Sequence, residues 1–163
     1  MTSLDKARAL AIAVPAALLA GAYGSEYWGG LYPCEMCWWQ RYAHFVGLVF
    51  ALLSFALRGF PDRGRSLVWL AALAILTSGG IGAYHAGVEA GIFEGFTQCT
   101  YSTSAGLSSE ELDKAIMAAP IVRSDDVQFS FLGISMAGWN AILSISAALL
   151  VLWLSLRRPR PRP

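Results

Sequence analysis

Four long stretches of the chain contain no charged residue and are mostly apolar. They run over residues 9–25, 42–57, 66–88 and 127–156. A helix needs about 20 apolar residues to cross the roughly 30 Å hydrocarbon core of a bilayer, and each stretch reaches this length once its flanking aromatic residues are included. None of them alternates apolar and polar residues as the strands of a membrane β-barrel do. The pattern therefore predicts an all-α membrane protein, built as a bundle of four transmembrane helices.

The predicted helices cover about residues 8–25, 37–57, 66–88 and 135–156 of a single integral membrane domain, 1–163, whose outer loops are 25–36 and 89–134. Within the second outer loop, the sequence LSSEELDKAIMAA is typical of a short amphipathic helix that begins after Ser108 or Ser109. Its apolar residues share one face, which predicts a helix lying flat at the membrane interface. Packing of this short helix against the bundle is the alternative.

Composition and charge agree with this architecture and give it an orientation. Of all residues, 56% are hydrophobic and 14% are charged. Nine basic residues flank the predicted helices on one side: Lys6, Arg8, Arg58, Arg63, Arg65, Arg157, Arg158, Arg160 and Arg162. The loops on the other side are mainly acidic, and the net charge of +1 conceals this asymmetry. The positive-inside rule predicts cytoplasmic termini and loops that face outward.

The first apolar stretch also fits a cleaved signal peptide. Lys6 and Arg8 would form its basic region, residues 9–19 its apolar core, and the sequence AGA its cleavage site. A retained first helix is the interpretation we favour, with the signal peptide as the alternative.

The three cysteines, Cys34, Cys37 and Cys99, all fall on the predicted outer side, where thiols can be oxidised. Cys34 and Cys37 form a Cys-x-x-Cys pair in YPCEMCWWQR. A zinc site would need further ligands, and Cys99, His44 and His85 are the only other cysteine and histidines, so we expect no metal. A structural disulfide across two residues closes too small a loop to stabilise the fold much. The pair is thus more typical of redox chemistry.

The position of the pair sharpens this interpretation. Pro33 ends any preceding helix, so Cys34 should lie near the N-terminus of the second membrane helix and Cys37 in its first turn. The helix dipole and the free backbone amides there favour a thiolate. We therefore expect Cys37 to be an electron donor, at a depth that a lipid-soluble acceptor can reach.

The segment PCEMCWWQRYAHF, with a further cysteine in the next outer loop of a four-helix chain, resembles the DsbB family. These disulfide bond formation proteins are quinone-reducing membrane oxidoreductases of bacterial envelopes. The resemblance spans roughly residues 10–156. It implies a multi-pass protein of the bacterial inner membrane with periplasmic redox loops and cytoplasmic termini. It also implies ubiquinone or menaquinone as cofactor and a periplasmic thioredoxin-fold, DsbA-like protein as partner, beside the quinone pool and the lipid bilayer. No nucleic acid is expected.

Carried over by position, the resemblance makes Cys34 and Cys37 the catalytic pair, with Cys37 next to the quinone ring, and makes Arg41 a quinone-binding residue. Arg41 lies one turn after Cys37 and could steady a quinone carbonyl or a thiolate. An arginine that extends to lipid headgroups is the alternative. His85 is the other expected quinone-site residue, against the alternative of a hydrogen-bonded histidine within the bundle. Glu89, one turn later, is either its partner or an interfacial charge.

Cys99 resembles the loop cysteine that exchanges disulfides with the soluble partner. The family carries a second cysteine later in this loop, and here Ser124 occupies that position, in VRSDD. Three explanations stay open: a deliberate Cys-to-Ser replacement that traps an intermediate, a natural variant with altered electron transfer, or a fourth cysteine position elsewhere. In the intact relay that the resemblance implies, the loop disulfide oxidises the partner, Cys34 and Cys37 reoxidise the loop, and quinone takes two electrons from Cys37.

Two other classes of protein remain as alternatives. A vitamin K epoxide reductase-like quinone/thiol oxidoreductase shares the four-helix bundle and the Cys-x-x-Cys pair, but the place of the pair at the start of the second helix, with Arg41 four residues on, argues against it. A non-enzymatic membrane assembly factor would use its cysteines only as structural disulfides. His44, Trp38 and Trp39 are expected to pack or to lie at the interface.

Overall fold

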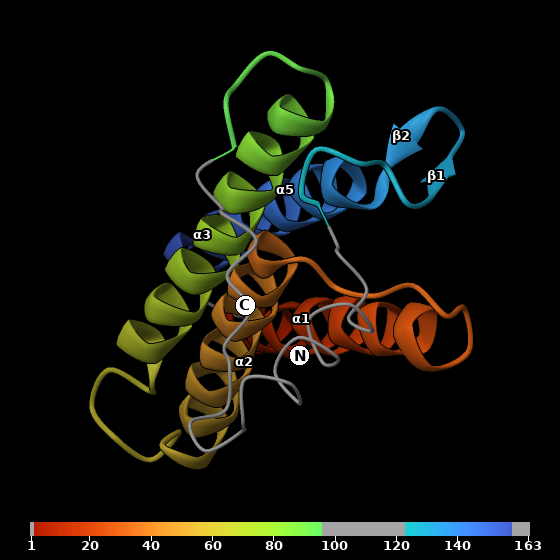
Figure 1. Cartoon of the computed structure of the whole chain (residues 1–163). Helices are drawn as coiled ribbons and strands as arrows, with labels where there is room; N and C mark the ends of the chain where they lie inside the picture. The colour runs from red at the N-terminus through yellow and green to blue at the C-terminus, as the bar shows by residue number, and fades with distance from the viewer. Residues whose placement is uncertain (1, 96–122, 158–163) are drawn as a thin grey trace, which may run out of the picture.

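The computed structural model describes residues 2–95 and 123–157. This part of the chain forms four helices and one short hairpin (Figure 1). They are α1 (Ser3–Tyr27), α2 (Glu35–Ala56), α3 (Arg65–Glu89), β1 (Ser130–Phe131), β2 (Ile134–Ser135) and α5 (Met136–Leu156). The structure confirms the helical bundle, whereas Cys99 and the predicted interfacial helix of the second outer loop lie outside the described residues.

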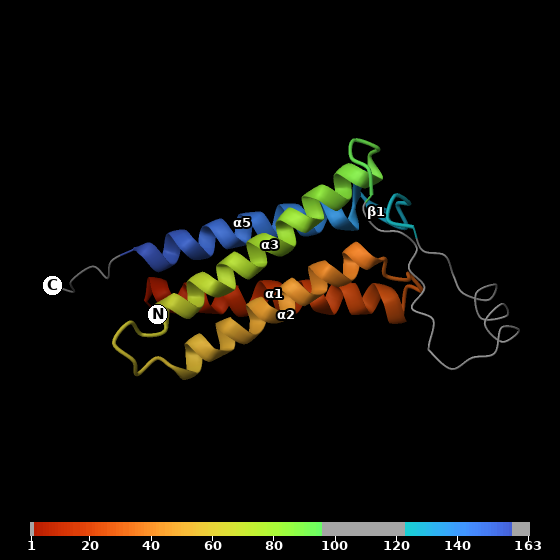
Figure 2. The same cartoon turned by 60° about the vertical axis from the view of Figure 1, so that its left-hand side comes forward.

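The helices form a ring in which α1 packs against α2, α2 against α3, α3 against α5, and α5 against α1. Figure 2 shows them running lengthwise past one another, with the start of α2, the end of α3 and the β hairpin at one end of the bundle. At the opposite end, the first residue of α1 meets the end of α5, where Ser3 Oγ donates to the backbone oxygen of Arg157 at 3.3 Å. The ends that carry the acidic loops and those that carry the basic flanks are thus separated by the length of the bundle.

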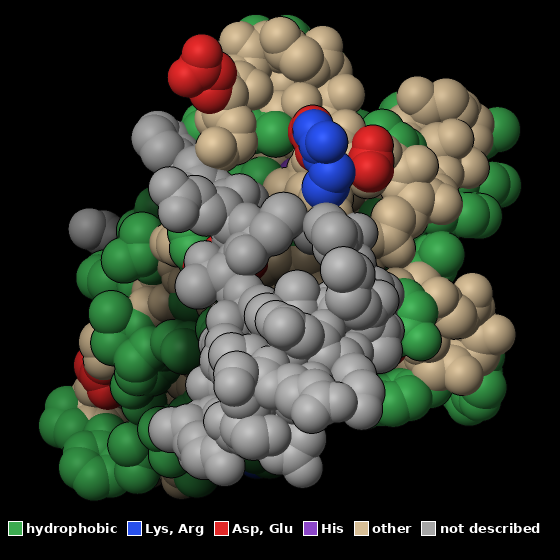
Figure 3. Space-filling view, in the orientation of Figure 1, with side chains coloured by type: hydrophobic (Ala, Val, Ile, Leu, Met, Phe, Trp, Pro, Cys, Tyr) green, Lys and Arg blue, Asp and Glu red, His purple; other side chains and the backbone are tan. Residues whose placement is uncertain are grey.

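Of the described helices, α1, α3 and α5 are long and apolar enough to cross a membrane. In Figure 3 hydrophobic side chains gather over the lower left of the face and along its right margin, whereas most of the charged side chains lie near the top. α2 is 22 residues long, but Gln40, Arg41 and His44 in its first half make it less apolar. All three side chains are buried within the bundle. Spanning by α2 remains a prediction.

The segment that also fits a signal peptide forms α1, which packs against α2 and α5. It begins five residues before the position predicted from the apolar pattern. The reason is a capping box, in which Thr2 Oγ1 accepts from the Asp5 backbone N–H at 3.2 Å and Asp5 Oδ2 accepts from the Thr2 backbone N–H at 2.9 Å. A polar cap extends the helix beyond its apolar core.

The β hairpin was not predicted from the sequence, which assigned residues 89–134 to a loop. Its two strands contain two residues each, too few for an alternating pattern to be visible. Leu132 and Gly133 at the turn both have positive φ angles, 53° and 76°, as in the type I′ turns that join two hairpin strands. Ser135, the last residue of β2, then caps α5 by accepting from the Gly138 N–H at 3.1 Å.

α3 and α5 approach each other closely through small residues. A Cβ atom added to Gly79 would lie 2.8 Å from Ile145 Cγ1 and 3.1 Å from Ser144 Cβ. One added to Gly82 would lie 3.0 Å from the backbone oxygen of Ala137. Small residues of this kind allow helices in membranes to pack backbone against backbone.

The close packing at Gly79 gives a stability prediction with a matched control on the same helix. Gly79→Val should lower the free energy of unfolding by about 1–3 kcal/mol, because the added methyl groups overpack the α3–α5 contact. Gly80→Val adds the same side chain where no atom lies within 4 Å of the new Cβ. Thermal unfolding in detergent should show a lower midpoint for the Gly79 variant alone. Equal midpoints for the two variants would contradict the packing of α3 on α5.

Candidate redox site

The Cys-x-x-Cys pair lies at the N-terminus of α2, at the end of the bundle that also holds the C-terminal ends of α1 and α3. Cys34 is the N-cap residue of α2, and its Sγ accepts from the Cys37 backbone N–H at 3.2 Å. Both residues are free thiols, and their Sγ atoms lie 2.8 Å apart. A disulfide requires about 2.05 Å between the sulfurs. A small movement of the side chains is therefore enough to form the bond.

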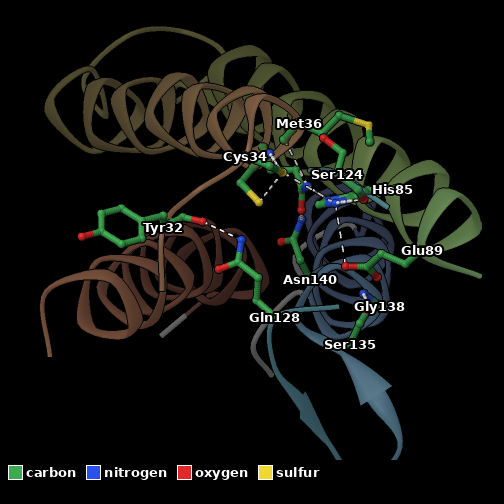
Figure 4. A network of polar contacts seen from close by, with 12 residues as sticks. Tyr32, Cys34, Met36, His85, Glu89, Ser124, Gln128, Ser135, Gly138 and Asn140 are labelled. Atoms are coloured by element: carbon green, nitrogen blue, oxygen red, sulfur yellow. Dashed lines mark hydrogen bonds and ion pairs between the residues drawn. The ribbon is translucent and has the colours of Figure 1, made fainter. Parts of the chain in front are cut away.

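A histidine from α3 lies against this pair. His85 Nε2 is 3.6 Å from Cys34 Sγ and 3.1 Å from the backbone oxygen of Ser124. The same nitrogen lies 3.7 Å from Glu89 Oε1, so Glu89 is a partner of His85 in the structure. Figure 4 shows His85 between these groups, with Cys34 on one side and Glu89 on the other. The backbone of Ser124, the residue at which the sequence analysis expected a family cysteine, is thereby held against the same ring nitrogen as Cys34.

The structure places the thiolate on Cys34, whereas the sequence analysis expected it on Cys37. The hydrogen bond with the Cys37 thiol is the largest cause and lowers the pKa of Cys34 to about 4, from an ordinary 9.0. Burial opposes this shift, and His85 adds to it. The N-cap sulfur also accepts from the backbone N–H of Cys37 in the first turn, which adds a smaller lowering of this pKa. Sequence position alone did not show which of the two sulfurs would do so.

Arg41 is buried, and its guanidinium faces α1. Its Nη1 pairs with Glu26 Oε2 at 2.5 Å and its Nη2 donates to the backbone oxygen of Ala22 at 3.1 Å. Its Cζ atom also lies 4.6 Å from the ring centroid of Tyr23 and 4.9 Å from that of Trp38. Arg41 therefore links α2 to the outer end of α1 and places a positive charge one turn from Cys37.

A cavity of about 760 Å³ connects these residues. This volume is within the range of about 300–1,000 Å³ that is usual for small-molecule sites. Its apolar wall includes Leu18, Leu19, Trp28, Phe129 and Met136. Its polar lining includes Cys34, Cys37, Gln40, Arg41, His44, His85, Glu89, Arg123, Asp126 and Asn140. A mostly apolar cavity with a few polar groups beside a dithiol fits a planar, lipid-soluble ring.

A chain of buried polar side chains crosses the bundle below the pair. Asn140 of α5 donates to Gln40 Oε1 at 2.7 Å, and Gln40 lies 3.0 Å from His85 Nδ1. Asn140 also accepts from His44 Nε2 at 2.9 Å, so His44 is a hydrogen-bonded residue of the bundle. The sequence analysis did not single out Gln40 and Asn140. Polar side chains within otherwise apolar membrane stretches were the signal that could have revealed them.

The structure also brings together possible metal ligands. One ligand atom each from Cys34, Cys37 and His85 lie within 4.8 Å of one another. A structural zinc site takes four ligands, and no other described Cys, His, Asp or Glu joins this group. That the protein uses no metal remains a prediction. Trp38 stacks obliquely on Tyr42 at 5.8 Å, whereas Trp39 is partly exposed on the outer surface of the bundle.

A helical membrane bundle with a vicinal dithiol at one end defines a class of protein, the membrane thiol–disulfide oxidoreductases. The family model described as "Disulfide bond formation protein DsbB" matches residues 5–154. This chain therefore belongs to the DsbB family of transmembrane disulfide bond formation proteins.

Individual members of this family are similar to the chain over most of its length. A "Disulfide bond formation protein B" from Marinobacter nauticus is 30% identical over 161 residues, which cover 94% of this chain and 92% of the relative. A protein of the same name from Paracidovorax citrulli is 32% identical over 167 residues, which cover 94% of this chain and 89% of the relative. One from Azoarcus is 32% identical over 142 residues, with coverages of 85% and 84%. No solved structure shows significant similarity.

The charge on Cys34 gives a prediction for the pH dependence of the reduced protein. Iodoacetamide should alkylate Cys34 with a midpoint near the pKa of about 4, compared with an ordinary 9.0. Cys37→Ala removes the main hydrogen bond and should move this midpoint upward. The rate is measured by mass spectrometry of the Cys34 peptide across pH. A midpoint close to 9 in the unsubstituted protein would contradict the thiolate assignment.

The same shift links stability to pH with a definite sign. The pKa of Cys34 is lower in the folded than in the unfolded chain, so the thiolate stabilises the reduced fold fully above the unfolded value of 9.0. This contribution declines as the pH falls and is lost below about 4. It is absent from the oxidised protein, which serves as the internal control. Thermal unfolding of both forms in detergent across this pH range measures it, and parallel profiles would show that Cys34 carries no such charge.

Proposed function

We propose that this protein is a membrane disulfide oxidase. It reoxidises a periplasmic, DsbA-like dithiol protein with a thioredoxin fold and passes the electrons through Cys34 and Cys37 to a membrane quinone, ubiquinone or menaquinone. One observation carries the proposal: two free thiols, with sulfurs 2.8 Å apart, line a cavity of about 760 Å³ beside Arg41 and His85. The names of the relatives support disulfide bond formation as the reaction.

The two sulfurs have different neighbours, which supports a division of labour between them. Cys34 lies on the side of His85 and the Ser124 backbone, and is the sulfur proposed to exchange with the loop. Cys37 is less buried and lies one turn before Arg41 along the same cavity. It is the sulfur proposed to deliver electrons to the quinone. Each exchange requires a thiolate in line with a disulfide, and the charge held on Cys34 makes it a good leaving group in the loop reaction.

The cavity fits a quinone headgroup in shape and in chemistry. Oxidation of the pair, with Cys34 as thiolate and Cys37 as thiol, releases two electrons and one proton. A quinone that is reduced to the quinol accepts these together with a second proton from solvent. The guanidinium of Arg41 has five N–H donors, and its bonds to Glu26 and Ala22 use two of them. The remaining donors can stabilise negative charge that develops on a ring oxygen. The apolar wall excludes water and admits a ring dissolved in lipid.

The proposal places the whole chain in the bacterial inner membrane as one domain. α2 would be the fourth span, because Gln40, Arg41 and His44 are buried within the bundle and most of its large side chains after Glu35 are apolar or aromatic. The basic flanks of the helices would face the cytoplasm and the redox end of the bundle the periplasm. The predicted interfacial helix of the second outer loop would lie on the membrane surface beside the site.

The electron-accepting half of the reaction can be tested without a protein partner. The fully reduced protein in lipid nanodiscs should reduce about one equivalent of a short-chain ubiquinone analogue and form the Cys34–Cys37 disulfide. Quinone absorbance and mass spectrometry of the peptide that carries both cysteines follow the two products. Cys37→Ala should abolish the reaction, whereas Gly80→Val, on the outer surface of α3, should leave it unchanged. Quinone reduction that persists in Cys37→Ala would contradict the proposal.

The exchange between the loop and the partner depends on which residue occupies position 124. A serine hydroxyl is too weak a nucleophile at neutral pH to resolve a disulfide. Once quinone has formed the Cys34–Cys37 disulfide, Cys99 should displace Cys37 from Cys34, and a thiolate of the reduced thioredoxin-fold partner should then displace Cys34 from Cys99. The partner is thereby held in a mixed disulfide with Cys99, Cys34 and Cys37 take up the two electrons, and turnover should stop at this species. Ser124→Cys should start catalytic quinone reduction, while Ser124→Ala, the matched control, should behave like the unsubstituted chain.

Adding the partner outside intact spheroplasts, where it cannot cross the membrane, tests the proposed orientation in the same assay. Equal turnover of the unsubstituted chain and the Ser124→Cys variant would mean that no loop cysteine at this position is needed. Turnover only after the membrane is permeabilised would overturn the orientation.

A further inference from the structure

The orientation of the Gln40 side-chain amide is fixed by its surroundings. Its Nε2 donates to the backbone oxygen of Met36 at 3.1 Å, and its Oε1 accepts from Asn140 Nδ2 at 2.7 Å. A carbonyl oxygen can only accept, so the group that faces Met36 is the NH₂. The same NH₂ lies 3.0 Å from His85 Nδ1. His85 Nδ1 must therefore accept a hydrogen bond, and it carries no proton.

The other ring nitrogen of His85 faces only acceptors. Nε2 lies 3.1 Å from the Ser124 backbone oxygen, 3.6 Å from Cys34 Sγ and 3.7 Å from Glu89 Oε1. A carbonyl oxygen, a thiolate and a carboxylate all accept, so Nε2 must carry the proton. Two independent sets of contacts thus select the same tautomer of His85.

Asn140 fixes Gln40 in the same way. Its Nδ2 lies 3.2 Å from the backbone oxygen of Ser78, which can only accept, and its Oδ1 accepts from His44 Nε2 and from Ser144 Oγ, each at 2.9 Å. The donors in this series of hydrogen bonds therefore all point the same way. His44 donates to Asn140, Asn140 to Gln40, Gln40 to His85, and His85 to Cys34. Aligned hydrogen bonds of this kind polarise and strengthen one another.

We propose that Gln40, held in place by Asn140, is a positioning residue that fixes His85 in the tautomer with its proton on Nε2, so that His85 donates to the Cys34 thiolate. This inference rests on the proposed function, because it assigns Gln40 a role in the same site. Without the Gln40 amide, the ring can place its proton on Nδ1. Its Nε2 lone pair would then face the thiolate, the Ser124 oxygen and the Glu89 carboxylate.

Other ionisable groups around the site come from several elements, and none of them is substituted in the test. The groups near Cys34 and His85 are Cys37 and Arg41 of α2, Glu26 of α1, Glu89 of α3, and Arg123 and Asp126 before β1. Substitution of Gln40 by a residue without charge changes none of them.

The chain contains only two histidines, which makes the tautomer measurable. The reduced protein is labelled with ¹⁵N at its histidine rings and reconstituted in nanodiscs, and His44→Gln identifies the signals of His85. We expect an unprotonated Nδ1 and a protonated Nε2 in the unsubstituted protein. Gln40→Met, similar in size but without a donor, should give a mixture of tautomers. Gln40→Glu, whose carboxylate accepts from Nδ1, should leave both nitrogens protonated.

The tautomer should also control the thiolate. Gln40→Met should raise the midpoint pH for alkylation of Cys34 by about one unit, the usual effect of a lost hydrogen bond to a charged group. Gln40→Glu should leave that midpoint low, because Nε2 keeps its proton. Thr77→Val is the control on α3, since the Thr77 hydroxyl is exposed and donates to the backbone oxygen of Leu73 on its own helix.

The outcomes separate the inference from the function it rests on. A proton on Nδ1 of His85 in the unsubstituted protein, or His85 signals unchanged in both Gln40 variants, would overturn the role of Gln40. Neither measurement uses quinone or a protein partner, so they stay valid if the proposed electron acceptor is wrong. Should Gln40→Met fail to fold, Gln40→Glu alone decides, through the protonation of Nδ1.

Discussion

The side-chain amide of Gln40 lies where three helices meet, and much of the site depends on its being satisfied there. In an apolar surrounding without water, an unpaired amide group costs several kcal/mol. Besides the Met36 backbone oxygen of its own helix, the amide of Gln40 on α2 has His85 on α3 and Asn140 on α5 as partners. The rotation of each of these helices about its own axis is therefore set by the same few bonds. Those bonds also decide which side chains face the cavity.

α1 joins this arrangement through a different interaction, the buried pair of Arg41 and Glu26. The guanidinium lies between the rings of Tyr23 and Trp38, so its position is fixed by packing as well as by charge. All four described helices thus contribute side chains to one end of the bundle, where α2 begins with the cysteine pair. Among the described residues, the opposite half is packed mainly by alanine, leucine, valine and isoleucine. Redox chemistry is confined to the end at which the loops enter.

The sequence predicted the features that depend on long patterns or on spacing along one element. The apolar stretches predicted the helical bundle, and the Cys-x-x-Cys pair predicted the redox site that we propose. The missed features depend on contacts between distant parts of the chain. Gln40 and Asn140 are 100 residues apart, and nothing near either residue indicates the other. The thiolate was expected at the wrong sulfur, because the contact that lowers the pKa of Cys34 from α3, that of His85, joins residues 51 positions apart.

The bond between Gln40 and Asn140 has a consequence for how the protein is made. In the four-span arrangement proposed above, α2 enters the membrane before α5 has been synthesised, and its first half carries polar side chains. Until α5 arrives, the amide of Gln40 and the ring of His44 have no Asn140 to bond to. α2 must then be held by water, by the insertion machinery or by α3 alone. Insertion of α5 is thus the step that fixes the position of α2 within the bundle.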